Sequence, residues 1–211
     1  MKAFDLSLYL VLDKVLCGST GMIATAREAV GGGATMVQLR DKHASTASLV
    51  ETGRALQAAL AGSPALLVVN DDVEAAVSLG ADGLHIGQDD GDPRAARARI
   101  GPAMVLGVSV ETEALAAGID PSLVDYVGAG PVFATDTKPG HKPPVGFAGL
   151  ASIVAVSPVP VVAIGGLKAR HAASVLAAGA KGLAVVSAIC GQPSPRLAAG
   201  QIAAAIGNAR R

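Results

Sequence analysis

LLVVNDD, residues 66–72, is a short apolar run that ends in polar side chains. Seven similar runs occur along the chain: LYLVLD (8–13), MVQLRDK (36–42), GLHIGQDD (83–90), MVLGVSV (104–110), DYVGAGPVFATDTK (125–138), VPVVAIGGL (159–167) and GLAVVSA (182–188). Continuous Val, Ile and Leu are typical of strands buried on both faces in a parallel sheet. Because Ala-rich segments of helical composition lie between the runs, the sequence predicts an α/β protein, a single (β/α)₈ TIM barrel over residues 1–211.

The boundaries of these elements can be predicted from the same pattern. Strands are expected to begin near Leu8, Met36, Leu66, Gly83, Met104, Asp125, Val161 and Leu183. Helices are expected over Thr20–Val30, Thr46–Ala61, Val73–Leu79, Pro93–Ile100, Glu113–Ala117, Phe147–Val156, Lys168–Ala178 and Pro195–Asn208. Asp92 before Pro93 is typical of an N-cap residue followed by proline in the first helical turn. Gly179 is typical of the glycine that directly follows the end of a helix.

An open doubly wound sheet is the structural alternative. Such a sheet concentrates its ligand site at one switch point in the strand order. Here polar or glycine-rich motifs follow nearly every predicted strand. In a barrel these motifs meet on one face, where the active site lies, so the barrel is favoured.

The composition indicates what fills the core and which classes of partner are not expected. Hydrophobic residues make up 51% of the chain but aromatic residues only 2%, which predicts a core of Val, Ile, Leu and Ala. The net charge of +0 gives no support for a nucleic-acid partner. No apolar run approaches roughly 18 residues, so no membrane span is expected. The apolar start is short and bracketed by Asp5 and Asp13, unlike a signal peptide, and a cytoplasmic location is expected.

The chain has two cysteines, Cys17 and Cys190, which lie far apart in the sequence without metal-ligand spacing. They are interpreted as reduced, buried thiols of a cytoplasmic protein. A disulfide and a catalytic thiol are the alternatives.

Basic residues follow the second predicted strand. Alternation along an extended chain sends Gln38, Arg40 and Lys42 to the same side. An Arg fork and a Lys point charge suit a phosphate or pyrophosphate. The alternative is a solvated strand end in which Arg40 pairs with Asp41 or another surface carboxylate.

Carboxylates follow the third and fourth predicted strands, in the motifs NDD (70–72) and QDD (88–90). Beside a basic cluster they suit Mg²⁺, which takes one or two carboxylates and completes its shell with phosphate and water. The alternative is that Asp71 and Asp90 cap the helices that follow them. His85, inside the fourth strand, is interpreted as a packed, hydrogen-bonded histidine.

The later strands offer a second anion site. Thr135, Thr137 and Lys138 follow the sixth strand, and the next segment, PGHKPPVGF (139–147), is either a lid or a surface loop. Gly165–Gly166 follows the seventh strand and Ser187 the eighth. The loops after the last two strands of a TIM barrel usually bind phosphate through backbone N–H groups.

Taken together, the motifs VQLRDK, VVNDD, HIGQDD, LGVSVET, DYVGAGPVFATDTK, KPPVG, VVAIGGL and AVVSAI resemble the thiamine phosphate synthase family in order and spacing. The resemblance runs from about Tyr9 to Cys190. It implies a transferase that joins 4-amino-2-methyl-5-hydroxymethylpyrimidine pyrophosphate to hydroxyethylthiazole phosphate, releasing pyrophosphate. It implies Mg²⁺ as cofactor and a dissociative reaction through a carbocation.

The resemblance also implies roles for individual residues. The pyrimidine pyrophosphate would contact Gln38, Arg40, Lys42, Asn70, Ser109 and Lys138. The thiazole phosphate would lie against Thr135, Thr137, Gly166, Val186 and Ser187. Within the same motifs the substrate-binding set includes Leu39, Asp41 and Asp136. Magnesium would bind Asp71 and Asp90, and the catalytic set would be Arg40, Lys42, Ser109 and Lys138.

The chain departs from the family pattern at two positions. Asp72 stands where the family often has Arg, and Asp89 where it often has Glu. The first change puts an anion beside the expected metal site, and the spacing favours Asp90 over Asp89 as the second ligand.

Two other functions remain as alternatives: a thiazole tautomerase of the same superfamily, and a non-catalytic barrel that binds a phosphate ligand. The partners expected in every case are small molecules. Self-association into a homo-oligomer is left open by the sequence.

Overall fold

The structure is a computed structural model that describes residues 4–135 and 143–211. Its centre is a closed barrel of parallel strands in sequence order, with β1 paired to both β2 and β8. The strands are β1 Leu8–Val11, β2 Met36–Leu39, β3 Leu66–Asn70, β4 Gly83–Ile86, β5 Val105–Val110, β6 Tyr126–Ala129, β7 Val161–Ile164 and β8 Gly182–Val185. The TIM-barrel prediction is therefore confirmed, and the open-sheet alternative is excluded.

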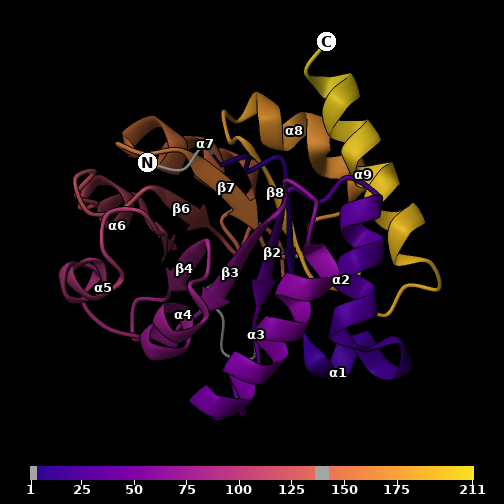
Figure 1. Ribbon diagram of the computed structural model, residues 1–211. Helices are drawn as coiled ribbons and strands as arrows, with labels where there is room; N and C mark the ends of the chain where they lie inside the picture. Colours follow the sequence, from indigo (N-terminus) through magenta and orange to yellow (C-terminus); the bar gives the residue numbers. More distant parts are fainter. Residues whose placement is uncertain (1–3, 136–142) are drawn as a thin grey trace.

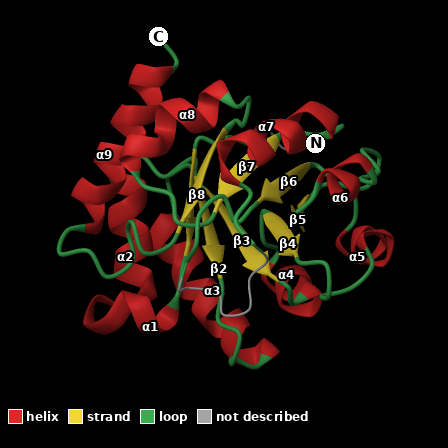
Figure 2. Cartoon of the chain, turned by 180° about the vertical axis from the view of Figure 1, so that it is seen from behind, coloured by secondary structure: helices red, strands yellow, loops and turns green. Residues whose placement is uncertain are grey.

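The helices form an outer layer around the barrel (Figures 1 and 2). They are α1 Lys14–Cys17, α2 Gly21–Gly31, α3 Thr46–Leu60, α4 Val73–Leu79, α5 Pro93–Ile100, α6 Glu113–Ala117, α7 Gly146–Val156, α8 Ala172–Ala177 and α9 Pro195–Ala209, with 3₁₀ turns η1 Gly18–Thr20 and η2 Ala169–His171. Helix α9, the last helix of the chain, packs beside α2 and α8 (Figure 1). None of the helices in the described ranges is long and apolar enough to cross a bilayer.

Local signals set most helix ends. The Asp92 side chain accepts a hydrogen bond from the Arg94 N–H and Pro93 opens α5, as predicted. Gly179 follows the C-cap of α8 with φ +91°, which favours glycine. Two differences are the short helix α1, which sequence reasoning missed, and the division of the helix predicted at Lys168–Ala178 into η2 and α8.

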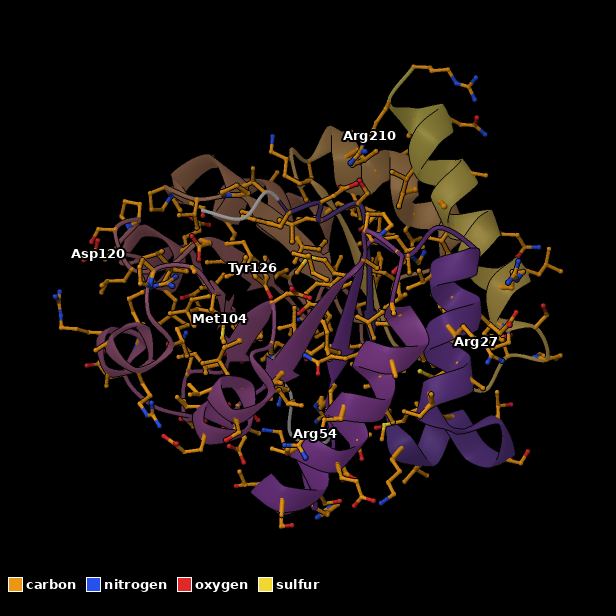
Figure 3. The ribbon with its side chains drawn as sticks, viewed as in Figure 1. Arg27, Arg54, Met104, Asp120, Tyr126 and Arg210 are labelled. Atoms are coloured by element: carbon orange, nitrogen blue, oxygen red, sulfur yellow. The ribbon has the colours of Figure 1, made fainter. Side chains whose placement is uncertain are left out.

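The core has two layers. The outer layer, between strands and helices, is dominated by Val, Ile, Leu and Ala, as the composition predicts. The layer inside the barrel differs, because it contains Tyr9, Tyr126 and Met36 among aliphatic side chains. Figure 3 shows Tyr126 within the ring of strands, whereas Arg27, Arg54 and Asp120 lie at the periphery. Both tyrosines of the chain thus lie where a purely aliphatic filling was expected.

Cys17 and Cys190 are both buried and unbridged. The Cys190 thiol contacts the Val11 carbonyl at 3.7 Å. Hydrogen bonding to Cys190 lowers the pKa of the Cys17 thiol to about 7, and burial opposes that shift. The interpretation as buried thiols agrees with this placement.

Candidate active site

A pocket occupies the carboxyl-terminal end of the barrel, with about 1210 Å³ of empty space that includes its opening to solvent. All eight strands or the loops directly after them contribute to its lining. Parallel strands of a closed barrel deliver their following loops to one face, which is why motifs distant in sequence meet here.

Most of the sequence-predicted site residues in the described ranges line this pocket. They are Gln38, Arg40, Lys42, Asn70, Asp71, Asp90, Ser109, Thr135, Gly166, Val186 and Ser187. Asp136, Thr137 and Lys138 lie outside the described residues. The roles assigned to those three positions therefore stay predictions.

Leu39 and Asp41 are predicted site residues that the structure does not bring into the pocket lining. The Leu39 side chain is fully buried in the outer core layer, on the opposite side of β2 from Gln38. The Asp41 carboxylate lies 3.3 Å from the Lys14 ammonium. Alternation within β2 turns Leu39 away from the side of Gln38, and Asp41 lies beyond the end of that strand.

Arg40 reaches the pocket while it also has a carboxylate neighbour. Its Nη1 lies 3.7 Å from Asp13 Oδ2, and both side chains are mostly buried. Asp13 in turn accepts a hydrogen bond from the Leu16 N–H and caps α1. The ion pair of Arg40 is thus with Asp13, not with Asp41. The Arg40 guanidinium still lines the pocket.

Lys42, Asp71 and Asp90 form a compact charged group at one side of the pocket. The Lys42 ammonium pairs with Asp71 Oδ2 and lies 3.7 Å from Asp90 Oδ1. Burial raises the pKa of Asp71, the hydrogen bond from Lys42 lowers it, and the adjacent Asp90 carboxyl raises it again. Two carboxyl groups that repel each other in this way favour a cation between them.

Asp71 has an unusual backbone. Its φ is +65°, the only positive value at a non-glycine residue in the described ranges. The Asp72 N–H donates to the Asn70 carbonyl over 2.8 Å, and the Asp71 N–H donates to the His85 carbonyl over 2.8 Å. These bonds hold Asp71 in a conformation that costs energy, a feature that clusters at functional sites.

The capping alternative for Asp71 and Asp90 is wrong. The N-cap of α4 is Asp72, whose side chain accepts from the Ala75 N–H, and the N-cap of α5 is Asp92. Asp72 also accepts a 2.7 Å hydrogen bond from Thr46 Oγ1. The N-terminus of α4 and the Thr46 hydroxyl group therefore stabilise the negative charge of Asp72.

The opposite side of the pocket is built from glycine. Gly165 and Gly166 have φ values of +102° and +63°, in the region that favours glycine. A Cβ at Gly165 would lie 2.6 Å from the Pro131 Cα, so the loop after β6 packs directly against the end of β7. Ser187 is exposed at the end of β8 and lines the same side. This arrangement suits an anion held by backbone N–H groups.

His85 is packed and hydrogen-bonded, as predicted. Its Nδ1 lies 3.0 Å from the Tyr126 hydroxyl and its Nε2 lies 2.9 Å from Ser109 Oγ. Tyr9 and Glu111 also line the pocket, and sequence reasoning did not select them. The signal for Tyr9 was available, because a phenol inside an apolar strand must find a hydrogen-bond partner.

Comparisons with known proteins agree with this geometry. A sequence model of the family described as thiamine monophosphate synthase matches residues 8–189. The chain is 46% identical over 210 residues to a thiamine-phosphate synthase of Azorhizobium caulinodans, covering 99% of this chain and 98% of the relative. It is 48% identical to that of Xanthobacter autotrophicus, covering 99% of each.

A solved structure shows the same similarity. The thiamine phosphate pyrophosphorylase from Pyrococcus furiosus superimposes with a TM-score of 0.87 at 35% identity, covering 97% of this chain and 96% of that one. Fold, pocket and sequence therefore agree, and the chain belongs to the thiamine monophosphate synthase family of enzymes.

Proposed function

We propose that the protein condenses 4-amino-2-methyl-5-hydroxymethylpyrimidine pyrophosphate with hydroxyethylthiazole phosphate to give thiamine phosphate and pyrophosphate. The observation that supports the proposal is one pocket whose two sides differ in chemistry and each suit an anion. Gln38, Arg40 and Lys42 lie on the side of the Asp71 and Asp90 carboxylates. Gly165, Gly166 and Ser187 form the other side. Two anionic substrates, one of them a pyrophosphate, fit this division.

The residues present fit a magnesium ion. Asp71 and Asp90 have adjoining carboxyl groups, and the ammonium of Lys42 lies against both. No group of three or more His, Cys, Asp or Glu side chains suited to a metal occurs in the described ranges. Two carboxylates suffice for Mg²⁺ because it draws its remaining ligands from water and substrate phosphate. Bound there, Mg²⁺ would supply positive charge to the leaving pyrophosphate.

The chain's own residues would act mainly by charge and position. Arg40 and Lys42 would bind the pyrophosphate and stabilise its negative charge as the C–O bond to the methylene carbon breaks. The leaving pyrophosphate takes the electron pair, and the electron-rich aminopyrimidine stabilises the resulting cation. The thiazole nitrogen then forms the C–N bond. That nitrogen carries no proton, so no general base is required, and the pocket contributes proximity and exclusion of water.

The direct test mixes purified protein with both substrates, with and without Mg²⁺, and follows thiamine phosphate and pyrophosphate together. Equal amounts of both products, formed only with Mg²⁺, are expected. Isomerisation of the thiazole phosphate without pyrophosphate release would overturn the proposal in favour of a tautomerase. Binding of a phosphate ligand without any turnover would indicate the non-catalytic barrel. The cytoplasmic location and self-association stay predictions.

The Asp90→Asn variant should require more magnesium. Losing one of two carboxylates weakens the hold on the ion, so the Mg²⁺ concentration for half-maximal rate should rise about tenfold. Rates measured over a Mg²⁺ titration check this. Asp89→Asn is the matched control and should leave the requirement unchanged. The reverse result would make Asp89 the ligand.

The Lys138→Ala variant should lose turnover while it keeps thiazole phosphate binding. Lys138 is proposed to stabilise the departing pyrophosphate, so kcat should fall by about 10²-fold or more. Steady-state kinetics, combined with calorimetric binding of the thiazole phosphate, separate the two effects. Loss of binding and turnover to the same degree would contradict this role.

A further inference from the structure

Five buried or half-buried polar side chains form a continuous hydrogen-bonded line through the inside of the barrel. Gln38 Nε2 donates to the Tyr9 hydroxyl at 2.7 Å, and the Tyr9 and Tyr126 hydroxyls lie 3.0 Å apart. His85 then bonds Tyr126 at 3.0 Å through Nδ1 and Ser109 at 2.9 Å through Nε2. We refer to these five residues as the barrel network. Its two ends, Gln38 and Ser109, are both expected to contact substrate.

The barrel backbone makes room for this network. A Cβ at Gly107 would lie 2.1 Å from Tyr126 Cζ, and one at Gly128 would lie 3.2 Å from His85 Cε1. The rings of Tyr126 and His85 lie 5.5 Å apart, centroid to centroid. Tyr126 is fully buried and Figure 3 shows it among the strands. Packing therefore holds the hydroxyl and imidazole groups in place, as a positioning device requires.

Both tyrosines keep their protons. Burial raises the pKa of the Tyr9 and Tyr126 phenols well above their usual range. Each phenol therefore has one proton to donate and also accepts hydrogen bonds. Their two protons must be directed along the network, because the cost of a buried donor without an acceptor is large.

These constraints give the network a direction. Since Gln38 Nε2 donates to Tyr9, the Tyr9 proton goes to the Tyr126 oxygen. The Tyr126 proton must then go to His85 Nδ1. The neutral imidazole carries its own proton on Nε2 and donates it to Ser109 Oγ. The opposite direction would leave the Tyr9 proton facing the Gln38 amide N–H.

The direction determines what the two ends offer to a ligand. Gln38 uses its N–H inside the network, and among the described residues no donor bonds its Oε1. Ser109 Oγ accepts from His85, so its own proton remains for donation. Both residues line the pocket. The pocket thus presents an acceptor at β2 and a donor at β5.

We propose that Tyr9, Tyr126 and His85 are positioning residues that hold Gln38 as a hydrogen-bond acceptor and Ser109 as a donor toward the substrate's aminopyrimidine ring. The exocyclic amino group of that ring donates, and its ring nitrogens accept. An oxo-pyrimidine, in which the amino group is replaced by a carbonyl, presents an acceptor to Gln38 and is rejected. The identity of the ring rests on the proposed function. The direction of donation along the barrel network is inferred from the hydrogen bonds and does not depend on that function.

The first measurement needs no substrate. Side-chain ¹⁵N NMR of the ligand-free protein, with the other three of its four histidines replaced one at a time for assignment, reports the tautomer of His85. The proton is expected on Nε2. A proton on Nδ1 would overturn the inference, even if the enzyme makes thiamine phosphate.

The second measurement uses the Tyr126→Phe variant of the full chain. Losing the hydroxyl breaks the network between Tyr9 and His85, so the KM for the pyrimidine pyrophosphate should rise about tenfold while the KM for the thiazole phosphate stays unchanged. The His85 signals should shift toward a mixture of tautomers. Val68→Ala is the matched control, since it removes apolar bulk from the same layer inside the barrel.

The outcomes separate the two proposals. Val68→Ala should lower thermal stability and leave both KM values unchanged. Equal rises in both KM values for Tyr126→Phe, or no rise at all, would overturn the positioning role. Absence of thiamine phosphate synthesis by the parent protein would remove the proposed function, whereas the NMR result on His85 would still decide the direction of the network.

Discussion

The Asp71→Asn variant is expected to lose about 10²–10³-fold in kcat/KM, because it neutralises one of the two carboxylates proposed to hold the Mg²⁺ that stabilises the leaving pyrophosphate. The substitution is nearly isosteric, and Asn tolerates the left-handed backbone that Asp71 adopts at φ +65°. The turn should therefore persist. Lys42 would keep Asp90 as its remaining neighbour in this group, 3.7 Å away. Steady-state kinetics across a Mg²⁺ titration measure the loss.

The neighbouring Asp72→Asn variant is the matched control for this result. Asp72 caps α4 and bonds Thr46, and Asn is as good an N-cap as Asp. Activity and magnesium requirement should remain close to those of the parent. A large loss in Asp72→Asn, together with full activity in Asp71→Asn, would contradict the proposed site and indicate that Asp72, not Asp71, binds the metal.

The Arg97→Ala variant is expected to lower the free energy of unfolding by about 3–5 kcal/mol, because it breaks a mostly buried ion pair. Arg97 Nη2 lies 2.6 Å from Asp125 Oδ2, with side chains 14% and 8% exposed. The same guanidinium donates to the carbonyls of Leu123, Gly101 and Met104. Its removal leaves the Asp125 carboxylate without its cationic partner and the three carbonyls without the guanidinium donor.

Chemical denaturation measures this effect, and the same helix provides its control. Arg99 on α5 pairs with Glu74 at 2.7 Å, but the two side chains are 51% and 60% exposed. Solvent screening makes such a pair weak, so Arg99→Ala should leave stability nearly unchanged. Equal destabilisation by the two variants would show that burial does not determine the strength of these pairs.

Much of the fold follows from the sequence alone. Continuous apolar runs with polar ends predict buried parallel strands, and five of the eight strands begin at the predicted residue: Leu8, Met36, Leu66, Gly83 and Val161. The short-range chemistry of Asp92–Pro93 and Gly179 determines helix ends, because capping depends on neighbouring residues. The pairing of the basic cluster with the acidic motifs also follows, since strand ends of a barrel meet on one face.

Only the tertiary structure decides the remaining questions. It shows that Asp72 and Asp92 cap the helices, so that Asp71 and Asp90 remain for the pocket. The spacing of the family motif favours Asp90, but which carboxylate of each motif turns inward depends on the backbone of its turn, which a sequence pattern does not contain. The hydrogen bonds from Gln38 through Tyr9, Tyr126 and His85 to Ser109 join five different strands. Sequence patterns report local geometry and burial, whereas such a network exists only after the barrel has closed.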